Sequence, residues 1–148
     1  MRPRDSAAAA AVCACFHFRK ASRAVTQLFD AVLAPSGLRS TQFVILVAVH
    51  AGDGPVALPD LAKSLGVDRS TLTRNLQPLR KAGLLKDAAN KRSRANHVKL
   101  SAKGERLLAE AKPLWEEAQK RFVEQLGAKR WPTLLKELNG VVDAARDA

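Results

Sequence analysis

The chain has 148 residues, of which 47% are hydrophobic and 26% charged, a composition typical of a folded protein and not of a disordered one. Its formal net charge of +11 at pH 7 favours a polyanionic partner, most often one rich in phosphate. Two cysteines two positions apart exclude a disulfide framework, and no apolar run reaches the roughly 20 residues that span a bilayer. We therefore expect one domain in the reducing cytoplasm, with no membrane association.

A long helix is predicted from about Ser6 to Leu33, because apolar side chains recur three and four positions apart. This stripe consists of Cys15, Phe18, Ser22, Val25, Phe29 and Val32. A seam of this kind on a terminal helix is often used to contact another subunit, and the alternative is a seam packed within its own domain. Pro35-Ser36-Gly37 ends the helix.

A second helix is predicted to run through Ala48, capped by Ser40 or Thr41. It is apolar nearly all round, so we expect it to be buried. Gly52 to Pro55 forms a turn, and Val56-Ala57 can form a short strand that pairs with a later hairpin.

Two short helical patterns joined by a tight turn lie between Leu58 and Ala82. Gly66 ends the first helix, and Asp68 is placed to cap the second. The second helix buries the stripe Leu72, Leu76 and Leu79. This arrangement is typical of a helix-turn-helix, in which the second helix enters the DNA major groove.

The opposite face of that second helix consists of side chains that can donate hydrogen bonds, with no acid among them. These candidate DNA contacts are Arg69, Ser70, Thr71, Thr73, Arg74 and Gln77. An ordinary helical hairpin with a solvated polar face has the same pattern, so the segment that follows decides between the two interpretations.

That segment predicts a basic β-hairpin wing. Leu84-Leu85-Lys86 and His97 to Leu100 have strand patterns, and a polar loop from Asp87 to Asn96 joins them. The loop supplies three further candidate contacts, Lys91, Arg92 and Arg94. Between Gly66 and Arg106 there are eleven Lys and Arg residues against three Asp and Glu. The sequence therefore favours a winged helix that binds double-stranded DNA over a winged helix used only for protein contacts.

Two further helices are predicted after the wing. Ser101 can cap a helix that runs to about Leu126, and Pro113 should interrupt and bend it. A last helix is expected over Trp131 to Ala145. The predicted fold class is thus mainly α with a small β-hairpin wing: a winged core at 34–104 and long terminal helices at 6–33 and 105–148. We expect the terminal helices to form a homodimer, which would set two recognition helices about 34 Å apart.

At this level of detail the chain resembles the MarR family of bacterial transcriptional regulators over almost its whole length. The segments that carry the resemblance are GLRSTQFVIL at Gly37–Leu46, LAKSLGVDRSTLTRNLQPLRKAGLL at Leu61–Leu85, and VKLSAKG at Val98–Gly104. The resemblance implies a cytoplasmic homodimer that binds pseudo-palindromic operators, usually as a repressor, and releases them when a small molecule or an oxidant arrives.

The resemblance also assigns roles to residues. Ser70, Thr71, Thr73 and Arg74 match recognition-helix positions that contact DNA. Arg94 matches the wing-tip Arg that reaches the minor groove, but Arg92 stands where the family usually has an Asp that braces this Arg.

Cys15 resembles the sensing cysteine of the family's organic-hydroperoxide-responsive branch, although the chain lacks the Tyr residues that this branch uses. Arg19 follows Cys15 by one helical turn and His17 follows Cys13, and a nearby cation favours the reactive thiolate. Two residues on one helix two positions apart point about 200° apart, so we do not expect Cys13 and Cys15 to bond to each other. The alternative is that Cys15 is a small apolar residue in the seam.

The family's usual effector site, a cleft between the winged helix and the dimer helices, has candidate residues here. They are Phe16, Phe18, Arg23, Phe43 and Trp115, and an apolar cleft with a cationic rim would suit an aromatic acid. His17, His50 and His97 lack metal-ligand spacing. We expect neither a metal site nor a cofactor, and the sequence shows no sign of an enzyme.

Overall fold

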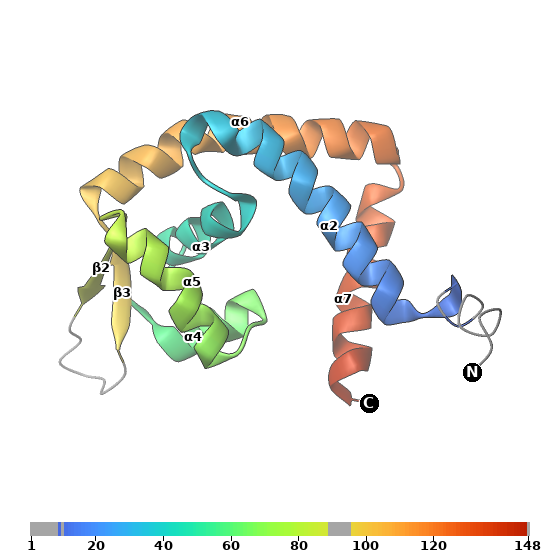
Figure 1. Cartoon of the computed structure of the whole chain (residues 1–148), viewed down its shortest axis with the longest axis horizontal. Helices are drawn as coiled ribbons and strands as arrows, with labels where there is room; N and C mark the ends of the chain where they lie inside the picture. The colour runs from blue at the N-terminus through green and yellow to red at the C-terminus, as the bar shows by residue number, and fades with distance from the viewer. Residues whose placement is uncertain (1–8, 10, 89–95, 148) are drawn as a thin grey trace. The chain divides into compact units, whose positions relative to one another are not determined.

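The computed structural model describes residues 9, 11–88 and 96–147 (Figure 1). The chain divides into two compact units, one made of Phe29–Trp115 and the other of Met1–Leu28 together with Glu116–Ala148. The first unit reaches beyond the predicted core of 34–104 at both ends, because Leu33, Leu108 and Ala111 belong to its buried cluster.

The unit Phe29–Trp115 is a winged helix. Its elements in order are the end of α2 (Ala14–Leu33), η1 (Ala34–Ser36), α3 (Ser40–His50), β1 (Val56–Ala57), α4 (Leu58–Leu65), α5 (Arg69–Lys81), β2 (Leu85–Ala88), β3 (His97–Leu100) and the start of α6 (Ala102–Leu126). The antiparallel sheet has the order β1-β3-β2, with Val56 opposite Val98 and Leu85 opposite Leu100. Figure 1 labels β2 and β3, which lie side by side. The predicted wing and its pairing with the short first strand are thus confirmed.

The core of this unit forms where α3, α4 and α5 pack with the sheet. Its largest fully buried side chains are Leu33, Leu46, Val49, Leu61, Leu72, Leu76, Leu79 and Val98. Each such side chain contributes about 1.5–3 kcal/mol on transfer from water. Because Leu72, Leu76 and Leu79 are all buried, the opposite face of α5 has to face solvent, as predicted.

The start of α3 differs from the prediction. The helix begins at Ser40, so neither Ser40 nor Thr41 is its cap. Instead, the Asp30 carboxylate accepts the Ser40 backbone N–H at 2.7 Å, and the Gln42 side chain accepts that of Arg39 at 3.0 Å. A carboxylate ten residues earlier and an amide inside the helix thus satisfy two of the N–H groups that have no carbonyl partner at this helix start.

The predicted burial of α3 is also only partly right. Phe43, Ile45 and Leu46 are buried, but Val44 and Val47 remain 47% and 41% exposed. No single described helix is long and apolar enough to cross a membrane; Ala14–Ser36 and Ser40–His50 reach that composition only as a bent pair. Core helices such as α3 commonly account for such a match.

The junction between α5 and α6 explains the motif VKLSAKG. Ser101 caps α6 as predicted, since its hydroxyl oxygen accepts the Gly104 N–H at 3.0 Å while its hydrogen goes to the Gly83 carbonyl at 2.6 Å. A Cβ at Gly104 would collide with the Leu84 carbonyl oxygen. The exit of α5 and the start of α6 therefore pack so closely that any side chain at position 104 would force one of them to shift.

The other unit contains most of α2, the end of α6, and α7 (Trp131–Asp147). The helix predicted from Ser6 is interrupted at Cys13: residues 9, 11 and 12 are helical, Cys13 is not, and α2 begins at Ala14. The Cys13 carbonyl accepts the His17 N–H at 3.2 Å. The predicted interruption at Pro113 is wrong, because α6 is one continuous helix. Phe122 and Trp131 meet edge to face at 5.6 Å and link α6 to α7.

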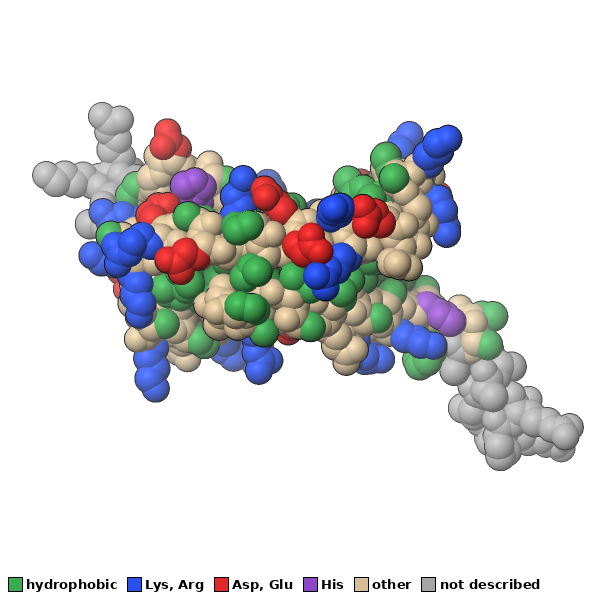
Figure 2. Space-filling view, turned by 90° about the horizontal axis from the view of Figure 1, so that it is seen from above, with side chains coloured by type: hydrophobic (Ala, Val, Ile, Leu, Met, Phe, Trp, Pro, Cys, Tyr) green, Lys and Arg blue, Asp and Glu red, His purple; other side chains and the backbone are tan. Residues whose placement is uncertain are grey.

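Much apolar surface of this unit stays exposed. Among the residues described, α7 buries no side chain, and the large exposed hydrophobic residues of the unit are Val12, Phe16, Phe18, Leu135, Val141 and Val142. Figure 2 shows such apolar side chains at the surface between basic and acidic ones.

Candidate nucleic-acid interface

Asp68 fixes the start of α5. One carboxylate oxygen, Oδ1, accepts the Thr71 backbone N–H and the Ser70 hydroxyl, both at 2.7 Å, and Oδ2 accepts the Thr71 hydroxyl at 2.9 Å. The Ser70 hydroxyl, followed by the backbone N–H and the hydroxyl of Thr71, holds the pKa of Asp68 well below its usual range. The cap that the sequence predicts is therefore an ionised carboxylate with three donors.

The polar face of α5 is presented to solvent as one surface. Arg69, Ser70, Thr73, Arg74 and Gln77 are exposed, and Thr71 is half-buried. Four of these residues, Arg69, Ser70, Thr73 and Arg74, line a single shallow depression. The structure thus brings Arg69, Ser70, Thr73 and Arg74 together on one surface, with Gln77 also exposed on α5 and Thr71 half-buried.

The wing residues Lys91, Arg92 and Arg94 lie outside the described residues. The base of the wing is described, and it contains an ion pair that sequence analysis missed. Asp87 Oδ1 on β2 accepts from Arg80 Nη2 at 2.6 Å and from Arg80 Nε at 3.1 Å. This contact ties the last turn of α5 to the wing, and the seven-residue separation across a turn gives no periodic signal.

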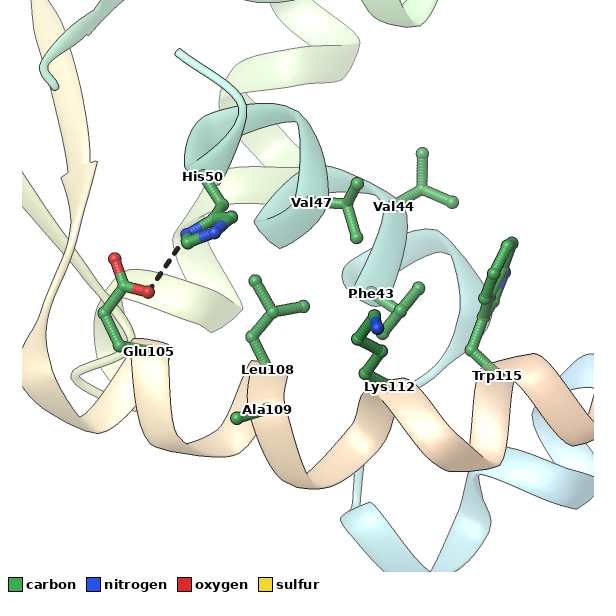
Figure 3. A pocket seen from close by; sticks show the side chains of 9 residues that line it. All are labelled: Phe43, Val44, Val47, His50, Glu105, Leu108, Ala109, Lys112 and Trp115. Carbon is green, nitrogen blue, oxygen red and sulfur yellow. Dashed lines mark ion pairs between the residues drawn. The ribbon is translucent and has the colours of Figure 1, made fainter. Parts of the chain in front are cut away.

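A second candidate site is an apolar pocket of about 440 Å³ between α3 and α6 (Figure 3). Its lining residues are Phe43, Val44, Val47, His50, Glu105, Leu108, Ala109, Lys112 and Trp115. Phe43 and Trp115 stack with ring centroids 5.8 Å apart at one end. At the other end His50 Nδ1 lies 3.0 Å from Glu105 Oε2.

The predicted effector residues divide between two places. Phe43 and Trp115 line the pocket, whereas Phe18 and Arg23 line a shallow depression on α2 with Arg19 and Ser22. Phe16 is exposed and meets the His17 ring edge to face at 5.3 Å. Val44, Val47 and His50 were missed because a helix that is apolar all round does not reveal which stripe it leaves uncovered.

Both cysteines are free thiols and exposed. Because Cys13 precedes the first residue of α2, the argument that the two thiols point to opposite sides of one helix loses its basis. Within residues 9, 11–88 and 96–147, no three His, Cys, Asp or Glu side chains gather in a way that could hold a metal ion.

Comparison with known proteins agrees with this geometry. A family model described as "MarR family" matches residues 36–93. The M. tuberculosis transcriptional regulator MosR in complex with DNA is 36% identical over 91% of this chain and 97% of that one, with a TM-score of 0.82. Another MosR structure gives 34% identity over 93% and 98%, with a TM-score of 0.80. The transcriptional repressor CouR, bound to a DNA duplex, is 26% identical over 90% and 95%, with a TM-score of 0.78. With the winged-helix core, the capped α5 and a relative of this identity over nearly its full length, the chain belongs to the MarR family of transcriptional regulators.

Proposed function

We propose that the protein is a sequence-specific, double-stranded DNA-binding regulator that inserts α5 into the major groove. The observation that carries the proposal is the division of α5 into a buried leucine face and a polar face on which two Arg, two hydroxyl and one Gln side chains are exposed and Thr71 is half-buried. Arg74 and Gln77 have the donor groups that read base edges, and MosR, 36% identical, has been solved in complex with DNA.

We further propose that it acts as a homodimeric repressor on a pseudo-palindromic operator. The apolar side chains exposed on α2 and α7, among them Phe16, Phe18 and Val142, support a second copy as their partner, because exposed apolar patches mark interaction surfaces. A two-fold dimer presents two copies of α5, and an operator with matching symmetry is the form of DNA that such a pair reads.

Selection of bound genomic fragments, followed by a salt titration, tests this function. A DNA reader enriches one motif and loses affinity linearly in log–log form as salt rises, since bound phosphates release counterions. A winged helix used only for protein contacts would enrich no motif and would show no such slope. The predicted cytoplasmic location stays a prediction.

The pocket between α3 and α6 supports release of DNA by a small molecule. Its walls are mostly apolar, Phe43 and Trp115 offer ring faces, and Lys112 is a cationic lining residue. An aromatic acid matches this chemistry. It would weaken DNA binding only if it binds the DNA-free conformation more tightly than the DNA-bound one.

Thermal shift with phenolic carboxylates tests the pocket. A ligand at 100 times its Kd stabilises the folded state by about 2.7 kcal/mol. Ala109→Trp should fill the pocket and abolish the shift, whereas Glu110→Trp, on the neighbouring position that does not line it, should retain the shift. If no phenolic carboxylate raises the melting temperature, or if both variants show equal melting-temperature shifts, aromatic acids are not the effectors that bind this pocket.

A thiol switch is the second candidate, favoured by the exposure of Cys15 and by the position of Cys13 outside α2. The Cys15 thiolate would attack the terminal oxygen of an organic hydroperoxide, the O–O bond would break and the alcohol would leave, giving a sulfenic acid. Mass spectrometry after cumene hydroperoxide treatment distinguishes this product from a Cys13–Cys15 disulfide. If Cys15→Ser loses DNA on oxidation as readily as the wild type, Cys15 is not the sensor.

A further inference from the structure

Asp68 is an acidic residue within the surface that we propose contacts DNA. Between Gly66 and Arg106 the three acidic residues are Asp68, Asp87 and Glu105. Asp87 pairs with Arg80 and Glu105 with His50, whereas the hydrogen bonds of Asp68 come from two hydroxyls and a backbone N–H. A carboxylate here repels phosphate, at a cap position that the neutral residues Asn and Ser could also fill.

The bonds to Asp68 change what its neighbours can offer to DNA. A hydroxyl has one hydrogen to donate and two lone pairs that accept. The Ser70 hydrogen goes to Asp68 Oδ1 at 2.7 Å, and the Thr71 hydrogen goes to Oδ2 at 2.9 Å. Both hydroxyls therefore have only acceptor capacity left for any other partner.

Ser70 is the more available of the two. Thr71 is half-buried, and its hydroxyl oxygen already receives Arg74 Nη2 at 3.4 Å. Ser70 is exposed and lines the depression on the α5 face. An acceptor at this place complements the groove-facing amino hydrogens of adenine and cytosine, and opposes O6 and N7 of guanine, O4 of thymine and the phosphate oxygens.

Thr73 provides an internal comparison. Its hydroxyl donates to the Arg69 backbone carbonyl at 2.8 Å, so its hydrogen is oriented by Arg69 and not by Asp68. Substitution at Asp68 should therefore leave Thr73 as it is and change Ser70 and Thr71 only.

We propose that Asp68 determines base preference by holding the Ser70 hydroxyl as an acceptor, so that Ser70 selects a base pair with an amino group in reach. The inference rests on the proposed contact between α5 and the major groove. Asp68 is in this sense a positioning residue: it acts through Ser70 and need not touch DNA itself.

Two substitutions of Asp68 distinguish its proposed effect on the Ser70 hydroxyl from its effects as a helix cap and as a negative charge. Asn and Ser both cap helices about as well as Asp, and both remove the negative charge. In Asp68→Asn the amide oxygen can keep the place of Oδ1, which accepts from the Thr71 N–H and the Ser70 hydroxyl. In Asp68→Ser the single, closer oxygen caps the Thr71 N–H and releases the Ser70 hydrogen.

The three proteins are compared by selection from a pool of duplexes with a random central sequence. We expect the wild type and Asp68→Asn to select adenine or cytosine at one position of each half-site, and Asp68→Ser to lose that choice or to prefer guanine or thymine there. If both variants bind every sequence more tightly with unchanged preference, Asp68 acts through its charge alone and the proposal is overturned.

A modified base gives a second readout that does not depend on how well an Asp68 variant folds. N6-methyladenine or N4-methylcytosine at the selected position replaces the groove-facing amino hydrogen by a methyl group. Wild type should lose roughly 2- to 12-fold in affinity, the worth of one hydrogen bond. Ser70→Ala should bind the methylated and the unmethylated duplex with equal affinity. The matched control Thr73→Ala should lose as much affinity on methylation as the wild type does.

The outcomes also separate this inference from the function on which it rests. An equal loss in wild type and Ser70→Ala overturns the role of Ser70 while leaving DNA binding intact. A wild type that selects no sequence from the pool contradicts the proposed function itself.

Discussion

The Ser101 hydroxyl donates to the Gly83 carbonyl oxygen over 2.6 Å while accepting the Gly104 N–H at 3.0 Å. One buried side chain thus satisfies the chain at the exit of α5 and at the start of α6. These two points are separated by the whole wing in sequence, so Ser101 fixes both ends of the hairpin.

Ser101→Ala should lower the free energy of unfolding by about 1–3 kcal/mol, because the buried Gly104 N–H loses its partner and the Gly83 carbonyl loses its donor. Urea denaturation measures the change. Ser64→Ala is the control, since the Ser64 hydroxyl also donates to a carbonyl, that of Leu61, but at an exposed residue. It should shift stability by no more than about 0.5 kcal/mol, and equal losses in the two variants would contradict the role of Ser101.

Gly104→Ala should destabilise the protein by about 1–3 kcal/mol, because the added methyl meets the Leu84 carbonyl oxygen. Helix propensity alone predicts the opposite effect of Gly→Ala, an increase of about 1 kcal/mol in the free energy of unfolding. Gly140→Ala in α7, where a Cβ would meet nothing within 4 Å, should show that gain. Calorimetric melting of both variants decides, and a stabilised Gly104→Ala would show that the junction can open without cost.

The cap of α5 should contribute stability that changes only in acid. The bonds from Ser70 and Thr71 hold the pKa of Asp68 below its usual range. A group with a depressed folded pKa contributes fully above its unfolded pKa, about 3.9 for Asp, and loses that contribution as pH falls through the folded value.

The difference in melting temperature between wild type and Asp68→Asn should therefore be constant from pH 8 to pH 5 and shrink below about pH 4. The subtraction removes groups that titrate alike in both proteins. A difference that stays constant below about pH 4 would mean that Asp68 titrates near its ordinary pKa in the folded protein.

Arg74→Ala and Arg94→Ala should affect DNA binding differently. Arg74 lies on the exposed face of α5, so its loss should cost about 1–3 kcal/mol and relax base preference. Arg94 is expected at the wing tip. The Arg94→Ala substitution should therefore weaken DNA binding to all sequences alike and reduce the slope of log affinity against log salt by about one. If both variants bind the selected operator as the wild type does, α5 and the wing do not contact DNA.

The winged helix was predictable because its signals are local. Gly66, with φ of 66°, ends α4, Asp68 caps α5, and the leucine stripe is buried as its spacing indicates. Contacts between residues distant in sequence were not predictable. Asp30 accepting the Ser40 N–H and Arg80 pairing with Asp87 leave no periodic trace.

The sites were predictable to different degrees. All six α5 residues share the expected face, because helical geometry fixes their directions. The pocket was anticipated only through Phe43 and Trp115, because its other walls depend on how α3 packs on α6. The hydroxyls of α5 were expected as donors, but the direction of a hydroxyl hydrogen is set by its neighbours, here Asp68 and the Arg69 carbonyl.

The most direct test of the central claim is the affinity of wild type and Arg74→Ala for the selected duplex and for a scrambled duplex of equal composition, at one salt concentration. A regulator that reads bases through α5 should prefer the selected duplex by at least about 10³-fold, and Arg74→Ala should narrow this ratio. Equal affinity of the wild type for the two duplexes would contradict the account.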